Sequence, residues 1–386
     1  MNRAFRFAVE HYLFVPAATV VAVVLANTVP DTYFRMAQAL SFLVNEVGMA
    51  FVLGFIAQEV LEATLPGGTL APLRSAVLPV VAALTGVLGA ATVYVLYILS
   101  GDTQNLLPGW RAATAVDIGL CYAVVSSILG RGSARTFALL LAVASDAIGL
   151  LLVSNGYAGN ETRPLALLLV ILAIVIAVYI RRRGVRSVWP YLLVPGVLSW
   201  AGLHAAGIHP ALALIPIVPF MPHTARHLAA PDRHEHERLS PPHFEEIARV
   251  PVQVISALFG LVNGGVMIHG FGDGTWAILA AALIGRPAGI LIGAAAALGV
   301  GLHLPRGMRR GDLVVIAIAA APAFTFGVFF ATAVFPDGPL LTEVKLGAMA
   351  SVAGSLIAFA FAFLRERGVR SGSALKTLRN ERGDSE

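Results

Sequence analysis

Long apolar stretches separated by short polar ones fill the chain from residue 12 to residue 364. Each is close to the ~20 residues that an α-helix needs to cross a bilayer core about 30 Å thick. We therefore expect an all-α polytopic membrane protein in which residues 1–368 form one membrane domain. The pattern predicts about twelve spans, at 12–29, 41–63, 75–99, 110–130, 134–154, 164–180, 187–203, 206–222, 245–268, 275–300, 312–335 and 344–364.

Charge alternates between the predicted loops. Arginines gather at the N-terminus, in every second loop and in the tail, whereas the other loops carry mainly acidic residues: Asp31, Asp102, Glu161, Asp273 and Asp337. Because arginine-rich short loops stay in the cytoplasm, both termini are predicted to be cytoplasmic. The loop charges alternate consistently along the whole chain, and this supports twelve spans more strongly than hydropathy alone.

Composition fits a membrane protein. Of 386 residues, 57% are hydrophobic and 13% charged, about half the charged share of a soluble domain. The pI of about 9.6 comes from arginines in loops, so no nucleic acid partner is expected and lipids are. The single cysteine, Cys121, excludes an intrachain disulfide. We interpret the first span as a retained helix and not as a signal peptide.

Two predicted spans look interrupted. The fourth contains Thr114 and Asp117, and the eleventh contains Pro322 with Gly327 soon after. Proline removes a backbone hydrogen bond, so the freed groups must face protein, water or an ion. The two spans are the middle members of triplets 3–5 and 10–12, as an inverted-repeat transporter would require. An ordinary proline kink is the alternative for Pro322.

Two charges are expected deep in the membrane. Asp146 follows Arg135 by 11 residues, or roughly 16 Å of helix, which places it near the midplane. Arg286 follows Asp273 by 13 residues, or roughly 20 Å. A carboxylate at this depth is a functional-site hypothesis by default. The structural alternative is that Asp117 and Arg286 only neutralise each other or the dipoles of the broken helices.

A buried carboxylate can hold either a proton or a small hard cation such as Na⁺. Thr114 and Ser145 offer hydroxyl oxygens at the same level, although such hydroxyls often bond back to their own helix. Proton and cation would compete for one site, and alternating access would convert that competition into exchange. Small cations and protons are thus the expected substrates, with no cofactor.

Other polar residues have weaker interpretations. Glu46, Glu59, Glu62 and Lys345 are candidates for pH sensing or for a hydrated funnel, and a plain helix-end charge is the alternative for Glu59 and Glu62. The loop at 223–243 carries five histidines, which could bind metal or sense pH. A solvated cytoplasmic loop is the favoured interpretation. The tail at 369–386 is expected to be disordered.

Eight stretches of the chain carry a resemblance to a known family. They are VNEVGMAFVLGFIAQEV (44–60), LAPLRSAVLPVVAAL (70–84), GWRAATAVDIG (109–119), LAVASDAIGLLLV (141–153), AGIHPALA (206–213), LVNGGV (261–266), IGRPAGI (284–290) and VKLGAMAS (344–351). These stretches resemble the NhaA family of bacterial sodium/proton antiporters. The resemblance implies an inverted-repeat fold with spans 4 and 11 broken and crossing beside the ion site. It also implies a core of spans 3–5 and 10–12, a homodimer formed by the other spans, the inner membrane and a role in pH homeostasis.

The resemblance assigns roles to individual residues. Asp146 matches the cation- and proton-binding member of the family's aspartate pair, and Asp117 matches the aspartate at the helix crossing. Arg286 stands where the family has a membrane-embedded lysine. Glu46 stands where it has an aspartate, and Glu59 matches a glutamate of the cytoplasmic funnel.

Departures from the family pattern change the expected mechanism. Ser145 replaces the first aspartate of the pair, and Val116 replaces a threonine. Leu61 and Glu62 replace basic residues of the funnel, which weakens the case for steep pH activation. Arginine, unlike lysine, keeps its proton. This combination resembles the electroneutral branch of the wider superfamily, so we predict one proton per cation.

Three other functions fit parts of the pattern. A sodium-coupled carrier of another solute could share the architecture. An intramembrane aspartyl protease would use Asp117 and Asp146 as a pair, although their flanks TAVD and VASD lack its glycine-rich motif. A cation channel is disfavoured because an arginine near the midplane opposes cation conduction.

Overall fold

The computed structural model describes residues 14–64, 74–130, 132–157, 163–222, 244–268, 271–305, 307–336 and 338–365. Regular structure in these ranges is entirely helical. Within the described residues, six helices are long and apolar enough to cross a membrane, and the number rises to eight if each of two bent helix pairs is one span. The loop at 223–243 and the tail at 369–386 lie outside the described residues.

The described helical elements fall mostly on the apolar stretches of the sequence. In chain order they are α2 (Phe14–Thr28), α3 (Pro30–Phe42), η1 (Leu43–Gly48), α4 (Met49–Thr64), α5 (Arg74–Leu99), η2 (Gln104–Thr114), α6 (Ile118–Leu129), α7 (Ser133–Tyr157), η3 (Pro164–Ala166), α8 (Leu167–Arg182), α9 (Trp189–Tyr191), η4 (Leu192–Gly196), α10 (Val197–Ala206), η5 (Pro210–Leu212), η6 (Val218–Phe220), α12 (Phe244–Asn263), α13 (Asp273–Ala280), η7 (Ala281–Gly285), α14 (Arg286–Gly299), α15 (Arg310–Ala319), α16 (Phe324–Val334) and α17 (Pro339–Ala350). Residues 353–365 are also helical.

The second predicted span begins earlier than expected. Its helix starts at Pro30 and runs through α3, the π-helical η1 and α4, where the hydropathy pattern had suggested a start near residue 41. Pro30 occupies the first turn and Asp31 follows it. Both residues favour a helix N-terminus, because proline needs no donor there and a carboxylate complements the helix dipole.

The predicted span at 206–222 is not a regular α-helix. It consists of two short 3-10 turns, η5 and η6, joined by further turns. Its hydrogen bonds are largely of the i to i+3 kind, such as the one from the Ala213 N–H to the Pro210 carbonyl, at 2.9 Å. Prolines at 210, 216, 219 and 222 remove the donors that an α-helix would require.

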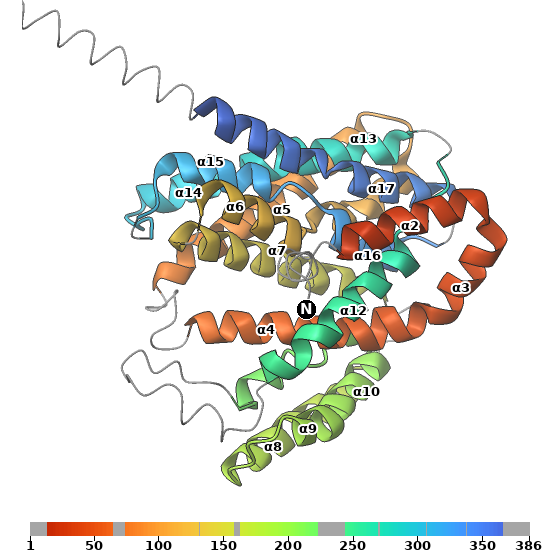
Figure 1. Ribbon diagram of the computed structural model, residues 1–386, viewed down its shortest axis with the longest axis vertical. Helices are drawn as coiled ribbons and strands as arrows, with labels where there is room; N and C mark the ends of the chain where they lie inside the picture. The colour runs from red at the N-terminus through yellow and green to blue at the C-terminus, as the bar shows by residue number, and fades with distance from the viewer. Residues whose placement is uncertain are drawn as a thin grey trace, which may run out of the picture.

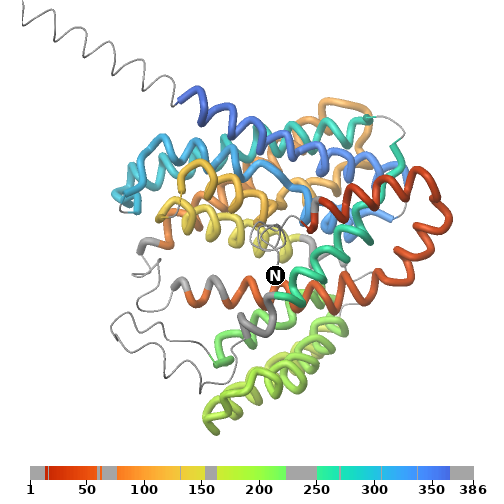
Figure 2. The backbone as a smooth tube through the Cα atoms, viewed as in Figure 1, coloured from red at the N-terminus to blue at the C-terminus, as the bar shows by residue number. Residues whose placement is uncertain are grey.

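The helices form two groups in Figure 1. Helices α5, α6, α7 and α13 to α17 make the bundle in the upper part of the view, and α8, α9 and α10 lie apart at the bottom. Helices α4 and α12 lie between these groups, and α3 runs down the right edge of the view from the level of α2 to that of α4. Figure 2 shows α12 running beside α2, although the two are far apart in sequence, and they pack directly.

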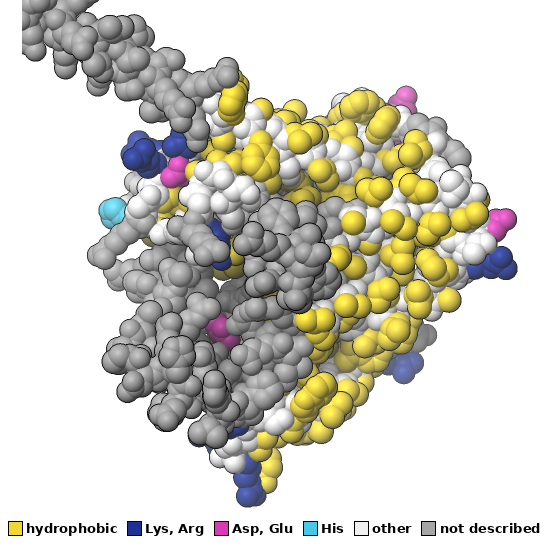
Figure 3. All heavy atoms as spheres, in the orientation of Figure 1, with side chains coloured by type: hydrophobic (Ala, Val, Ile, Leu, Met, Phe, Trp, Pro, Cys, Tyr) yellow, Lys and Arg dark blue, Asp and Glu magenta, His cyan; other side chains and the backbone are white. Residues whose placement is uncertain are grey.

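The surface suits a lipid environment. Hydrophobic side chains cover most of the described surface in Figure 3, and charged ones lie mainly at its margins. Helix α8 exposes a series of large apolar side chains, among them Leu168, Ile171 and Val175. Such a face is unfavourable in water and favourable against lipid tails.

Close packing of α5 against α14 fixes the position of Arg286. A Cβ atom added at Gly289 would overlap the carbonyl oxygen of Thr85, and one at Gly89 would overlap that of Gly285. Small residues at a helix interface allow such backbone approach, and they are typical of contacts between membrane helices. Arg286, the first residue of α14, is thereby held next to α5 and the elements packed on it.

Candidate functional site

The first bent pair is η2 with α6, whose axes differ by 50°. Residues 115–117 between them are not helical. Asp117 is the N-cap of α6, and its Oδ1 accepts a hydrogen bond of 2.8 Å from the Leu120 N–H. Aspartate is among the preferred N-caps because its oxygen satisfies a first-turn donor. The helix is therefore interrupted where the sequence predicted it, with the carboxylate at the start of its second half.

The second bent pair is α15 with α16, at 48°. Residues 320–323 separate them and include Pro322, whose ring nitrogen cannot donate a hydrogen bond. The Ala323 N–H, freed by the break, donates to the buried Ser351 Oγ at 2.8 Å, and this hydroxyl donates in turn to the Ala348 carbonyl at 2.6 Å. The break at Pro322 is thus a full interruption supported by a neighbouring helix.

The two breaks contact each other through Asp117. Its backbone N–H donates to the Pro322 carbonyl at 2.7 Å. Its Oδ2 accepts from both the N–H and the hydroxyl of Thr325, at 3.0 Å and 2.6 Å. Because Thr325 lies in the first turn of α16, the carboxylate complements the positive ends of two half-helices. Asp117 is 5% exposed and has three donors.

Asp146 lies in the middle of the unbroken α7, beside the first break. Its Oδ1 accepts a hydrogen bond of 2.8 Å from the Val116 N–H. Its Oδ2 is buried and has no hydrogen-bond partner among the described residues, and the side chain is only 1% exposed. A buried polar atom without a partner requires a specific explanation.

Arg286 is the positive charge of the site and is also 1% exposed. Its Nη2 donates to the carbonyl of Ala113, at the end of η2, while Nε and Nη1 have no hydrogen-bond partner in the described part of the chain. A cation at this point complements the negative end of a half-helix. Its charge also acts electrostatically on that of Asp146. The bond to Ala113 agrees with the dipole-compensating alternative drawn from the sequence.

Both predicted hydroxyls bond back to backbone. The Thr114 Oγ1 donates to the Arg111 carbonyl at 2.6 Å, and the Ser145 Oγ donates to the Leu141 carbonyl at 2.9 Å. Both side chains are buried. A hydroxyl that donates in this way keeps its lone pairs, so either oxygen can still be offered to a cation.

The sequence did not indicate Thr325, Ser351 or Cys121 as part of the site. Thr325 lies 208 residues from its partner Asp117, and only its place just after Pro322 could have suggested it. Cys121 is fully buried one turn after Asp117, and its thiol is within electrostatic reach of Asp146 and Arg286.

A broken helix pair meeting beside a buried carboxylate is the arrangement expected of an ion transporter. Comparison with known proteins agrees. The family model described as Na⁺/H⁺ antiporter 1 matches residues 10–364. The chain belongs to this antiporter family.

Curated relatives cover nearly the whole chain. It is 38% identical to the Na⁺/H⁺ antiporter NhaA of Desulfitobacterium hafniense over 88% of this chain and 90% of that protein. It is 39% identical to antiporter NhaA 2 of Pelobacter propionicus, over 88% and 92%, and 38% identical to NhaA of Geobacter metallireducens, over 92% and 95%. Family membership and the apolar helices together identify a multi-pass membrane protein of the antiporter type.

The remaining predicted residues lie on other elements of the antiporter. Glu46, on η1, pairs with His204 at 3.5 Å, and its carbonyl accepts from the Trp200 indole at 3.3 Å. Glu62 accepts from the Gln58 amide at 3.0 Å within α4. Lys345 is partly buried on α17. Glu59 lies in α4, but its side chain is outside the described residues.

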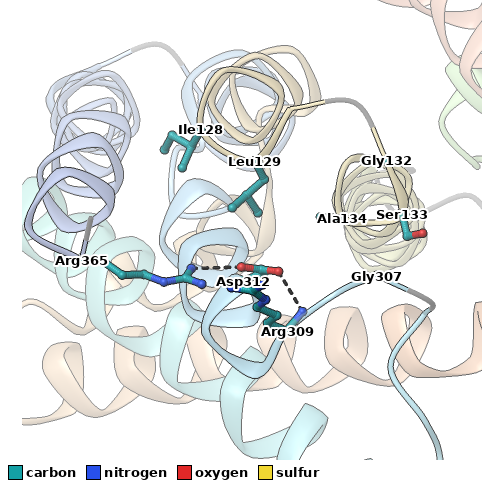
Figure 4. Close-up of a pocket in the computed structure, with 9 residues that line it drawn as sticks. All are labelled: Ile128, Leu129, Gly132, Ser133, Ala134, Gly307, Arg309, Asp312 and Arg365. Carbon is teal, nitrogen blue, oxygen red and sulfur yellow. Dashed lines mark hydrogen bonds and ion pairs between the residues drawn. The ribbon is translucent and has the colours of Figure 1, made fainter. Parts of the chain in front are cut away.

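A separate cavity of about 520 Å³ opens at the ends of α6 and α15 that point away from the breaks. Figure 4 shows Asp312 between Arg365 and Arg309 in this cavity. The Asp312 carboxylate accepts from the Arg365 guanidinium at 3.0 Å and from the Arg309 N–H at 2.8 Å. None of the predicted site residues lines it, and in the described part of the chain no group of three His, Cys, Asp or Glu residues is arranged to hold a metal.

Proposed function

We propose that the chain exchanges Na⁺ or Li⁺ for H⁺ by alternating access, and that Asp146 binds cation and proton in turn. The observation that carries this proposal is the unpartnered Oδ2 of a carboxylate that is 1% exposed. Family membership supports the same exchange. An oxygen of this kind needs either a proton or a cation to compensate its burial.

The surroundings of Asp146 offer further oxygen ligands to a small hard cation. The hydroxyl lone pairs of Thr114 and Ser145 and the carbonyls freed at the breaks are of the required chemical type. A proton on Oδ2 and a cation on Oδ2 exclude each other. If the site opens to one side of the membrane at a time, that exclusion couples the two ions.

The charge pattern favours one proton per cation. Asp117 has three of its roughly four lone-pair positions filled by donors, and Arg286 keeps its charge at any physiological pH. Only Asp146 is then available to load and unload. One half-cycle carries one cation across the membrane, and the other carries one proton in the opposite direction. The exchange is therefore electroneutral.

The proposal includes the membrane arrangement inferred from the sequence. It comprises about twelve spans in the inner membrane, both termini in the cytoplasm, and Asp146 near the midplane. Spans 3–5 and 10–12 form the core around the two breaks, and the other spans form the homodimer side. The separation of α8 to α10 from the upper bundle in Figure 1 is compatible with such a division.

The experiment that tests this function is proton flux in proteoliposomes. Vesicles carry a pH-sensitive dye and are given Na⁺, Li⁺ or K⁺. We expect native protein to release protons on addition of Na⁺ or Li⁺, and Asp146→Asn to fall to the level of protein-free vesicles. Asp102→Asn removes a carboxylate from an exposed loop and serves as the matched control, with native flux.

Native-rate exchange by Asp146→Asn would contradict the proposal. The absence of any Na⁺- or Li⁺-driven proton movement in native vesicles would also contradict it. If those vesicles instead took up another solute in a Na⁺-dependent manner, the sodium-coupled carrier would replace the antiporter.

A further inference from the structure

Asp117 and Asp146 are two carboxylates beside the same break, yet we have assigned ion transport to only one of them. Something must therefore keep Asp117 out of the exchange. Leu120 donates to its Oδ1 as part of an ordinary helix cap. The second oxygen, Oδ2, depends entirely on Thr325.

We propose that Thr325 is a positioning residue that keeps Asp117 a fixed charge and thereby sets the exchange at one proton per cation. This inference rests on the proposed function. Thr325 donates twice to the same oxygen, with its N–H at 3.0 Å and its hydroxyl at 2.6 Å. Hydrogen bonds to an ionised acceptor are shorter and about twice as strong as neutral ones.

The hydroxyl contributes something that the backbone cannot replace. Without it, Oδ2 keeps one donor and gains an exposed lone pair facing the second break. The carboxylate then has one donor on each oxygen, which is closer to the state of Asp146, with one donor on Oδ1 and none from the described residues on Oδ2. A second proton carrier at the breaks would make the exchange two protons per cation, and one net charge would cross the membrane in each cycle.

Helix α16 provides a matched pair of substitutions. Thr325→Val removes the hydroxyl with nearly the same side-chain volume and keeps the backbone N–H. Thr332→Val makes the same change two turns later, where the hydroxyl donates to the Phe329 carbonyl at 2.7 Å and not to Asp117. Thr325→Ser keeps the hydroxyl and is the conservative variant. Both threonines are partly buried.

The measurement is the Na⁺ gradient at which net proton flux vanishes in vesicles whose potential is clamped with K⁺ and valinomycin. We expect no dependence on potential for the native protein, Thr332→Val or Thr325→Ser. For Thr325→Val, we expect the gradient to shift toward tenfold for each ~59 mV applied, the value for one net charge. Adding Asp117→Asn to Thr325→Val should abolish the shift.

A Thr325→Val variant that remains insensitive to potential would overturn the role of Thr325 while leaving the proposed exchange intact. Native vesicles without Na⁺- or Li⁺-driven proton flux would overturn the exchange itself. If Thr325→Val does not transport, protons released per Na⁺ bound are counted in detergent. More than one supports the proposal, and one, as in the native protein, overturns it.

Discussion

The junction of the two broken helices and the middle of α7 each hold a buried carboxylate, but the two carboxylates accept different numbers of hydrogen bonds. At the junction, Asp117 receives donors on both oxygens from α6 and α16. In α7, the described residues provide Asp146 with one donor on one oxygen and with no partner for the other. Exposure does not separate the two, because both side chains are almost completely buried. The number of donors does.

This difference follows from where each residue sits in its helix. Asp117 precedes a helix, so the first-turn N–H groups of α6 and α16 are open to it. Asp146 sits inside a helix whose own N–H groups are engaged along the backbone. Its single donor, the Val116 N–H, is available only because the neighbouring span is broken. A carboxylate at a helix start is thus readily satisfied, whereas one in mid-helix is left ready for an ion.

The largest expected effect on stability comes from Asp117→Asn. An asparagine cannot accept from all three donors, because its NH₂ group must face one of them. At least one bond is replaced by a contact between two donors and the remaining bonds lose their charge assistance, so we expect the free energy of unfolding to fall by about 4 kcal/mol. Asp146→Asn keeps its one acceptor and removes a buried charge, so its stability should stay near native while exchange is lost.

Titration with a denaturing detergent measures both variants against Asp102→Asn. A lower stability of Asp146→Asn than of Asp117→Asn would contradict the different roles assigned to the two carboxylates. Unfolding of Asp117→Asn like the control would contradict them as well.

A smaller effect is expected from Gly289→Ala on α14. The added methyl would overlap the backbone of α5 at Thr85, so the helices must separate and shift Arg286, three residues earlier. Overpacking of this kind is expected to lower the free energy of unfolding by up to about 3 kcal/mol. Gly299→Ala, near the end of the same helix, has no neighbour within 4 Å and should be neutral. Equal stabilities of these two variants would show that the close packing does not hold Arg286.

Arg286→Met should have the smallest effect on stability of the three. It leaves the Ala113 carbonyl without its donor and the half-helix end without compensation. However, it also removes a buried charge with two unpaired nitrogens, which offsets part of the loss. We expect a net decrease of about 2 kcal/mol. The free energy of unfolding should fall less for Arg286→Lys. It should stay at the native value for Arg35→Met, which changes an exposed position on α3. A native-like Arg286→Met would contradict compensation by this residue.

The sequence was informative where one residue type determines local geometry. Pro322 and the pair Thr114 and Asp117 correctly predicted both helix interruptions. The spacing from Arg135 predicted a deeply placed Asp146, and the side chain is 1% exposed. Two helix assignments needed correction. The prolines at 206–222 act together to prevent an α-helix, and Pro30 starts a helix where a loop was expected.

The partners of the site could not be predicted from the sequence. The contacts of Asp117 with Thr325 and of Ala323 with Ser351 join residues far apart in the chain. No periodicity or local motif encodes such pairings. They depend on how the two bent pairs pack, as does the single donor that reaches Asp146 from Val116.

The most direct test of Asp146 as the single carrier is a proton count on purified protein. Na⁺ is added to the protein in weakly buffered detergent solution, and the released protons are measured with a pH indicator. We expect about one proton per chain from the native protein and from Asp102→Asn, and none from Asp146→Asn. Proton release by Asp146→Asn at the native level would show that the ions are exchanged elsewhere.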